Sequence, residues 1–180
     1  EEGKEVSLQK LISIHSSNHF GDKKPLENAI ADLNSDISLD GEIFKSINSW
    51  GDIWSRSDVK IEGDRLSQTL IRLHIFHLFA TASNFHKSID AGIPARGLHG
   101  EAYRGHIFWD ELYVLPFYIS QFPEIAKSVL MYRYRRLDKA REYAKEYGYK
   151  GAMFPWQSGS SGREETQTIH LNPISGKWGD

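Results

Sequence analysis

The sequence predicts a mainly α-helical fold, and three observations support this prediction. Apolar residues recur at steps of three or four over several long stretches, which is the spacing of one helix face. Glycine, proline and serine gather mostly between those stretches, where they predict loops. Only residues 6–14 show the alternation of apolar and polar side chains that is typical of a strand. Since a single strand is not stable by itself, we expect its partner strands upstream of Glu1.

Pro25 and Asp40 mark the starts of the first two predicted helices. Proline suits the first turn of a helix, because its missing N–H would have no partner there. The first helix therefore runs from Pro25 to about Leu33. Aspartate is a good N-cap, and apolar residues spaced three or four apart follow Asp40 as far as Trp54, which predicts the second helix.

A long helix, a loop and an aromatic segment come next. Asp64 is the expected N-cap of a helix through about Ser83, whose broad apolar face indicates burial on more than one side. Residues 89–100 contain three glycines and a proline, which predict a loop. Residues 103–121 fit helix or strand by composition. Their length favours a helix, which Pro116 would kink or break.

The clearest helical pattern runs from Pro123 to Tyr147. Its apolar residues recur at steps of three or four, and Gly148 follows as the expected C-cap. From Gly151 onward, glycines, serines and Pro155 predict extended loops. The expected architecture is therefore a series of packed helices with long functional loops between them.

Composition and charge exclude several classes of protein. Hydrophobic residues make up 39% and charged residues 26% of the 180 residues, so a packed core is expected rather than disorder. The formal net charge is −2, and the nearest approach to a basic run, residues 133–136, is interpreted as a solvated helix face. No apolar run reaches the roughly 18 residues of a membrane span. We therefore expect neither a nucleic acid nor a membrane as partner, and a cytoplasmic location.

Metal and disulfide chemistry has little support in the sequence. The chain has no cysteine, which excludes disulfides and thiolate metal sites. His74 and His77 lie three residues apart on an apolar helix without an H-E-x-x-H pattern, so core or groove-lining positions are the better interpretation. We expect no metal and no cofactor. Both ends of the chain look cut, which indicates a fragment of a longer protein.

Residues 97–111 (GLHGEAYRGHIFWDE) combine the chemistry that a sugar site needs. Carboxylates accept hydrogen bonds from neighbouring hydroxyls, arginine and histidine donate them, and an indole covers the apolar face of a sugar ring. An ordinary helix start, with Trp109 in the core and the carboxylates near the helix dipole, explains the same composition equally well. The candidate binding residues of this segment are Tyr103, Arg104, His106, Trp109 and Asp110.

A second candidate segment, residues 152–166, is a loop that carries Trp156, Gln157 and two adjacent carboxylates. Glu164 and Glu165 would point to different sides of an extended chain. They are therefore not expected to act as the facing acid/base pair of a glycosidase. A polar surface loop anchored by Trp156 is the alternative, and the residues alone favour it.

Five stretches, in order along the chain, resemble glycoside hydrolase family 65. This family contains the maltose, trehalose and kojibiose phosphorylases with the related acid trehalases and glucosidases. A glycine-rich block that ends in Phe-Trp-Asp, followed downstream by Phe-Pro-Trp, makes the resemblance specific. The matching stretches are 50–64 (WGDIWSRSDVKIEGD), 73–80 (LHIFHLFA), 95–110 (ARGLHGEAYRGHIFWD), 131–144 (MYRYRRLDKAREYA) and 148–162 (GYKGAMFPWQSGSSG).

The resemblance implies an (α/α)6 toroid of paired helices, preceded by a β-sandwich and a helical linker. Residues 1–22 would then be the end of the sandwich, which accounts for the short β segment. Residues 23–54 would be the linker, and residues 55–180 the N-terminal part of the catalytic domain.

The resemblance also implies an activity: an inverting α-glucoside phosphorylase, which turns a disaccharide and inorganic phosphate into β-glucose 1-phosphate and a sugar. Trp109 and Asp110 would bind the non-reducing glucose, and Trp156 with its loop would shape the pocket around the scissile bond. Gln157 stands where many members have glutamate, which puts the acceptor preference in doubt. Tyr103, Arg104 and His106 lie in the matching block, without a specific role.

We expect the catalytic residue of the family outside this chain. Family members protonate the leaving oxygen with a glutamic acid of a downstream Pro-Asp-Glu motif, which we expect beyond Asp180 together with the phosphate-binding loop. The fragment alone is therefore expected to be inactive. A trehalase- or glucosidase-like inverting hydrolase is the first alternative. The others are a non-catalytic sugar-binding or scaffolding domain and a helical domain without a sugar function. The complete protein could also form a homodimer.

Overall fold

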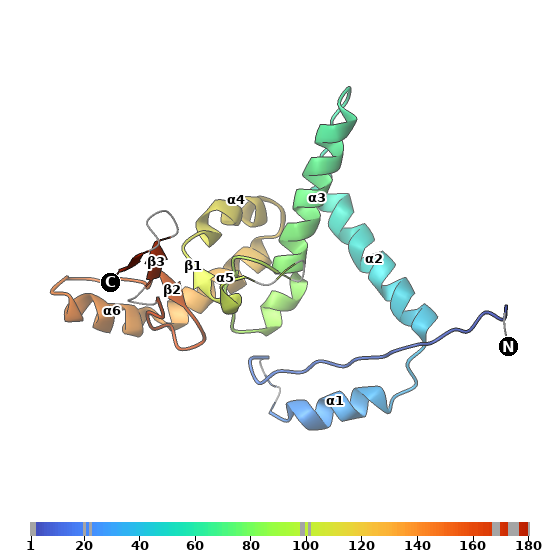
Figure 1. The fold of residues 1–180 in the computed structure, drawn as a ribbon, viewed down its shortest axis with the longest axis horizontal. Coiled ribbons are helices and arrows are strands. Elements are labelled where there is room, and N and C mark those ends of the chain that lie inside the picture. The colour runs from blue at the N-terminus through green and yellow to red at the C-terminus, as the bar shows by residue number, and fades with distance from the viewer. Residues whose placement is uncertain are drawn as a thin grey trace. The chain divides into compact units, whose positions relative to one another are not determined.

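The computed structural model of this protein describes residues 3–19, 21, 23–97, 100, 102–166, 170–172 and 177–179. The described part is mainly helical, as predicted (Figure 1). The chain divides into two compact units, Glu1–Arg56 and Ser57–Asp180. No helix in the described residues combines the length and the apolar character that crossing a membrane requires.

The first unit contains α1 (Pro25–Leu33) and most of α2 (Leu39–Ser57). Helix α1 starts and ends at the predicted residues. Helix α2 begins earlier than predicted, because Ser38 and not Asp40 is its cap: the Ser38 hydroxyl accepts a hydrogen bond from Gly41 N at 3.3 Å.

The strand predicted for residues 6–14 is not formed. Residues 4–16 carry no regular secondary structure, because no described segment offers the ladder of backbone hydrogen bonds that a strand needs. Side chains tie this segment to α1 instead. The Asp32 carboxylate accepts a hydrogen bond from Ser13 Oγ at 2.9 Å and lies 2.8 Å from His15 Nε2.

The second unit starts with α3 (Arg65–Thr81), whose predicted cap is confirmed: Asp64 Oδ1 accepts a hydrogen bond from Leu66 N at 2.9 Å. The expectation that α3 is buried on more than one side is wrong for the described residues. Only Ile75 and Phe79 are fully buried on it. A short 3₁₀ helix, η1 (Asn84–Ser88), follows.

The core of the second unit lies between α3, α4 (Glu111–Gln121) and α5 (Pro123–Arg135). The Phe79 ring packs edge-on against Phe122 and Tyr118, with centroids 4.8 and 6.0 Å away. Helix α4 continues through Pro116 without a break.

Residues 103–121 are not one helix, contrary to the prediction. Tyr103–Gly105 form a 3₁₀ turn, η2, and Ile107–Phe108 form strand β1 before α4 begins. The reason is local: Tyr103 and Arg104 have positive φ angles of 54° and 55°, which no α-helix accommodates.

The helix predicted from Pro123 to Tyr147 is divided into α5 and α6 (Leu137–Glu146). The break lies at Arg136, where φ is −106° and ψ is 13°. Apolar spacing could not reveal it, because the steps of three and four continue across the break. The end of α6 is as predicted: Tyr149 N–H bonds Ala144 O and Gly148 N–H bonds Lys145 O, a Schellman motif with Gly148 at φ +76°.

Three short strands lie in the stretch predicted to be loops only. Strand β2 (Gln157–Ser158) pairs with β1, and β3 (His170–Asn172) pairs with β4 (Lys177–Gly179), both antiparallel. The two- and three-residue length of these strands explains why no alternating pattern announced them.

Candidate functional site

A two-residue antiparallel ladder brings the two candidate segments together. Ile107 pairs with Ser158, and Phe108 pairs with Gln157. Continuing this register by one residue sets Trp109 opposite Trp156 at one end. At the other end, it sets a histidine, His106, opposite a glycine. Side chains directly opposite each other across such a pair are close enough to touch.

The two predicted tryptophans form an exposed aromatic pair. The ring centroids of Trp109 and Trp156 are 5.4 Å apart, and the planes are inclined by 52°. Tyr113 adds a third ring, 5.5 Å from Trp109. Trp109 is 37% and Trp156 is 56% exposed. The alternative is therefore wrong in placing Trp109 in the core, whereas the helix start that it expected, with Asp110 and Glu111 at the N-terminus of α4 (Glu111–Gln121), is confirmed. The pair forms an open platform.

Asp110 lies beside this pair as the N-cap residue of α4. Its side chain makes no capping hydrogen bond, and in the described part of the chain its carboxylate is not used by any other partner. Asp110 borders a pocket of about 220 Å³ between α3 and α4, which His77 also lines. Such a carboxylate at a helix N-terminus is available for hydroxyl donors of a ligand.

The next residue, Glu111, is used differently. It is 5% exposed, and its carboxylate accepts hydrogen bonds from Arg133 Nε at 2.7 Å and from Ile93 N at 3.4 Å. Arg133 also donates to Phe108 O at 3.0 Å. Glu111 and Arg133 thus hold β1 in place from inside the unit.

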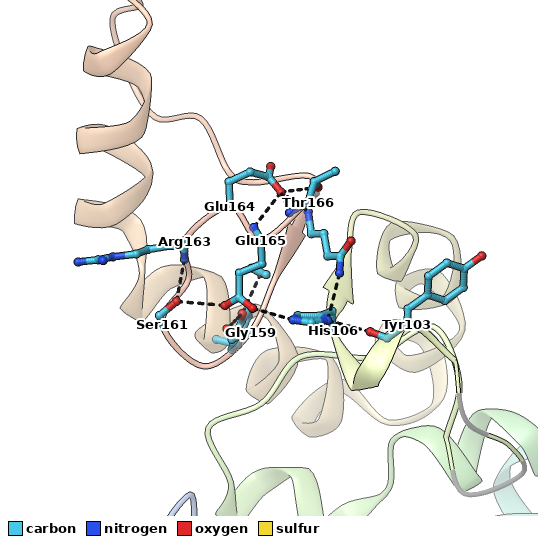
Figure 2. A network of polar contacts seen from close by, with 11 residues as sticks. Tyr103, His106, Gly159, Ser161, Arg163, Glu164, Glu165 and Thr166 are labelled. Atoms are coloured by element: carbon cyan, nitrogen blue, oxygen red, sulfur yellow. Dashed lines mark hydrogen bonds and ion pairs between the residues drawn. The ribbon is translucent and has the colours of Figure 1, made fainter. Parts of the chain in front are cut away.

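His106 connects the two candidate segments (Figure 2). Its Nε2 lies 2.7 Å from Glu165 Oε2, and its Nδ1 lies 2.8 Å from Tyr103 O and 3.1 Å from the Gln157 side-chain nitrogen. The hydrogen bond from His106 is the largest cause that holds the pKa of Glu165 below its usual value; burial opposes it, and the histidine charge adds to the lowering. The structure therefore brings together Tyr103, His106 and Gln157. Their hydrogen bonds mainly connect residues 103–106 to the loop of residues 152–166.

Glu164 and Glu165 do not face each other. Glu165 turns to His106, whereas Glu164 accepts hydrogen bonds from its own loop, beginning with Trp156 N at 2.7 Å. Arg104, the remaining predicted binding residue, is exposed in the 3₁₀ turn. Of the two histidines on α3, His77 lines the pocket and His74 is exposed.

The basic run at the end of α5 was not recognised as part of the site by sequence reasoning. Arg136 donates to both oxygens of Asp90 at 3.1 Å and to Ser160 O at 2.7 and 2.9 Å. Its side chain is only 11% exposed, so the prediction of a solvated helix face is wrong here. Arg136 ties loop 89–100 to loop 152–166, and its interleaving with tyrosines was the only signal in the sequence.

Tight backbone approaches explain two glycines of the first loop. A Cβ on Gly97 would overlap Ala80 O and Thr81 Cα at the end of α3, and a Cβ on Gly92 would lie 2.8 Å from Ile107 Cγ2. Only glycine lets the loop pass so close to its neighbours. Among the described residues, no group of three or more histidines, aspartates or glutamates could hold a metal ion.

Residues 72–180 match the model of the glycosyl hydrolase family 65 central catalytic domain. Trehalose 6-phosphate phosphorylase of Lactococcus lactis is 42% identical over 180 residues, which cover 99% of this chain and 23% of that protein. Kojibiose hydrolase of Flavobacterium johnsoniae is 40% identical over 178 residues, which cover 97% and 25%.

A solved structure, described as a putative kojibiose phosphorylase from the human microbiome, is similar with a TM-score of 0.64 and 32% identity. The match covers 77% of this chain and 20% of that one. The chain spans 13% to 25% of the length of the curated relatives that it matches.

Proposed function

This chain belongs to glycosyl hydrolase family 65, and on that premise we propose that it supplies the glucose-binding part of an inverting α-glucoside phosphorylase. The reaction breaks the bond between C1 of glucose and the linking oxygen. Inorganic phosphate forms the new bond to C1 from the opposite face, and the leaving oxygen takes up a proton. The products are β-glucose 1-phosphate and a free sugar, and no metal or organic cofactor takes part.

The observation that carries this proposal is the exposed aromatic pair beside an uncommitted carboxylate. The indole rings of Trp109 and Trp156, 5.4 Å apart, offer apolar faces to a pyranose ring. Asp110 borders the neighbouring pocket and accepts hydrogen bonds from two adjacent hydroxyls of the non-reducing glucose. Trp156 and Gln157 lie toward the scissile bond and the acceptor sugar.

The proton donor of the reaction is proposed to lie outside these 180 residues. Three glutamates of the described residues around the site are committed: Glu111 to Arg133, Glu164 to backbone N–H groups and Glu165 to His106. A general acid must reach the leaving oxygen with its own proton, which a carboxylate bound in this way does not provide. The chain therefore positions the sugar, and by itself it does not turn it over.

An inverting hydrolase is the second candidate, because one relative with 40% identity is named kojibiose hydrolase. In that case the same glucose site serves a reaction in which water replaces phosphate. The two reactions differ in the nucleophile that attacks C1, which is phosphate in one and water in the other.

Product analysis of the complete enzyme distinguishes the two candidates. Trehalose 6-phosphate and kojibiose, the sugars in the names of the relatives, are the test substrates. We expect glucose 1-phosphate to form only when inorganic phosphate is present. Release of free glucose at the same rate without phosphate would replace the phosphorylase by the hydrolase, and turnover of neither sugar would remove the support for both substrates.

A further inference from the structure

The loop that carries Trp156 folds around a single carboxylate, that of Glu164. Its Oε2 accepts a hydrogen bond from Trp156 N at 2.7 Å. Its Oε1 accepts from the N–H groups of Gln157 at 3.2 Å, Glu165 at 3.1 Å and Thr166 at 2.9 Å, and from the Thr166 hydroxyl at 2.5 Å. Figure 2 shows Glu164 bridging to Thr166 above the His106 network. Both oxygens are thus used inside the loop.

These hydrogen bonds favour the ionised form of Glu164. An ionised carboxylate only accepts hydrogen bonds, and bonds to a charged group are about twice as strong as neutral ones. Partial burial works against ionisation, but the bonds from Thr166, Trp156 and Gln157 together outweigh it and keep the pKa of Glu164 below its usual value. The loop is therefore held by a charged centre at neutral pH.

The position of this centre matters for the aromatic pair. Trp156 immediately precedes β2, so its amide is the first one beyond the ladder with β1. Its ring is 56% exposed, and its described ring contact is that with Trp109. Because little packing surrounds the ring, the hydrogen bond at the Trp156 amide is, beside the Trp109 contact, a described interaction that limits where the ring lies.

We propose that Glu164 is a positioning residue, which fixes the backbone of Trp156 and thereby the geometry of the Trp109–Trp156 pair. The inference rests on the proposed function, because it gives the pair the task of holding the sugar. Glu164 itself does not touch the substrate; it acts through the Trp156 amide.

The substitution Glu164→Gln in the complete enzyme tests this role at one atom. Four donors converge on Oε1, so the amide oxygen of glutamine takes that place and its NH₂ group faces Trp156 N–H, donor against donor. We expect the KM for the disaccharide to rise about tenfold, with kcat within about threefold, because the lost hydrogen bond orients the binding platform. The control is Glu142→Gln, on an exposed side chain of α6 paired with Lys139, and should change neither constant.

A second variant separates positioning of Trp156 from general loop stability. Thr166→Val removes the hydroxyl donor to Oε1 and leaves the bond between Oε2 and Trp156 N intact. We expect its KM to rise less than about threefold. If Thr166→Val raises KM as much as Glu164→Gln does, the loop as a whole matters and the proposal is wrong.

A double-mutant cycle with Trp156 gives a readout that a merely structural role would not move. If Glu164 acts through the Trp156 ring, Glu164→Gln has almost no further effect on KM in the Trp156→Ala background. An equal tenfold effect in both backgrounds contradicts the proposal.

The variant Asp110→Asn distinguishes a failure of the proposed sugar site from a failure of the positioning role of Glu164. If it has no effect, the proposed sugar site fails. If it impairs binding while Glu164→Gln does not, only the present inference fails.

Discussion

The two ends of the β1–β2 ladder both carry residue types suited to a sugar site but use them in opposite ways. At the open end, Trp109, Asp110 and Trp156 are exposed, and the Asp110 side chain makes no capping bond. At the braced end, His106 is 11% exposed at its side chain and is bonded on both ring nitrogens, to Glu165 and to Tyr103 O. Residue types suited to sugar binding are also suited to joining loops. Whether their hydrogen bonds are already satisfied separates the two uses.

Two neighbouring carboxylates show the same contrast within one helix turn. Asp110 and Glu111 both lie at the start of α4, yet Asp110 borders a pocket and Glu111 is buried against Arg133. Substitutions at the open end should therefore change sugar binding and leave stability nearly unchanged. Substitutions in the braced and buried part should do the reverse.

The largest effect on stability is expected from Glu111→Gln. It leaves the Arg133 guanidinium, only 15% exposed, without its counter-charge. Breaking a buried pair in this way costs about 3 kcal/mol of unfolding free energy, measured by chemical denaturation. Asp58→Asn is the matched control, because its pair with Arg72 has the same chemistry and is far more exposed. Equal losses in the two variants would contradict the structural role given to Glu111.

Removing one ring of the aromatic pair should have the next largest effect, in this case on sugar binding. For Trp156→Ala we expect an increase in the KM for the disaccharide of about thirtyfold, or about 2 kcal/mol. The unfolding free energy should change little, because the side chain is 56% exposed. Trp156→Phe should recover part of the affinity. A destabilised variant with an unchanged KM would show that Trp156 is a structural anchor, as the sequence alone favours.

A smaller effect, on stability and not on sugar binding, is expected from His106→Gln. This change removes the imidazole hydrogen bond to Glu165 and weakens the link between loops, at a cost of about 1 kcal/mol in unfolding free energy. The KM should change less than about threefold, because we expect no contact between His106 and the sugar. A large rise in KM with unchanged stability would move His106 into the binding site.

The smallest effect is a dependence of loop stability on pH. The pKa of Glu164 is lowered by the Thr166, Trp156 and Gln157 bonds against the opposing effect of burial, and that of Glu165 by the bond and charge of His106. Carboxylates with a lowered pKa contribute stability above the ordinary pKa of 4.5 and lose it as the pH falls through the lowered value. The stability difference between the native protein and Glu164→Gln should be constant near neutral pH and shrink below about pH 4.5. A difference that is the same at acid pH would contradict the charged centre.

The parts of the fold that sequence predicts are those decided by local chemistry. Asp64 caps its helix, Pro25 opens one and Gly148 closes another, because each of these preferences acts within one turn. Two predictions failed, the strand at residues 6–14 and the single helix from Pro123, because both depend on contacts between residues that are far apart in sequence. A strand requires a partner segment, and the break at Arg136 lies where its side chain bonds Asp90 and Ser160, which are far away in sequence.

The sequence supplied candidate residues for the site but not the contacts between them. Tryptophan, aspartate and histidine behind a glycine-rich loop fitted a sugar site and a helix start equally well, and only the resemblance to family 65 favoured the sugar site and selected Trp109 and Asp110 within it. Nothing in the sequence indicated that residues 107–108 pair with residues 157–158, since two-residue strands leave no pattern. The roles of Glu111, Glu164 and Arg136 depend on that pairing, and sequence reasoning could not assign them.

The most direct test of the account is the binding of D-glucose to the complete enzyme and to its Asp110→Asn variant, measured by isothermal titration calorimetry. If Asp110 holds the sugar, the variant binds at least about tenfold more weakly, because a charged acceptor of two hydroxyls is lost. Its thermal midpoint should stay that of the native protein, since the carboxylate makes no capping bond in the fold. Unchanged glucose affinity in a normally folded variant would contradict the central claim that Trp109, Asp110 and Trp156 form the glucose site.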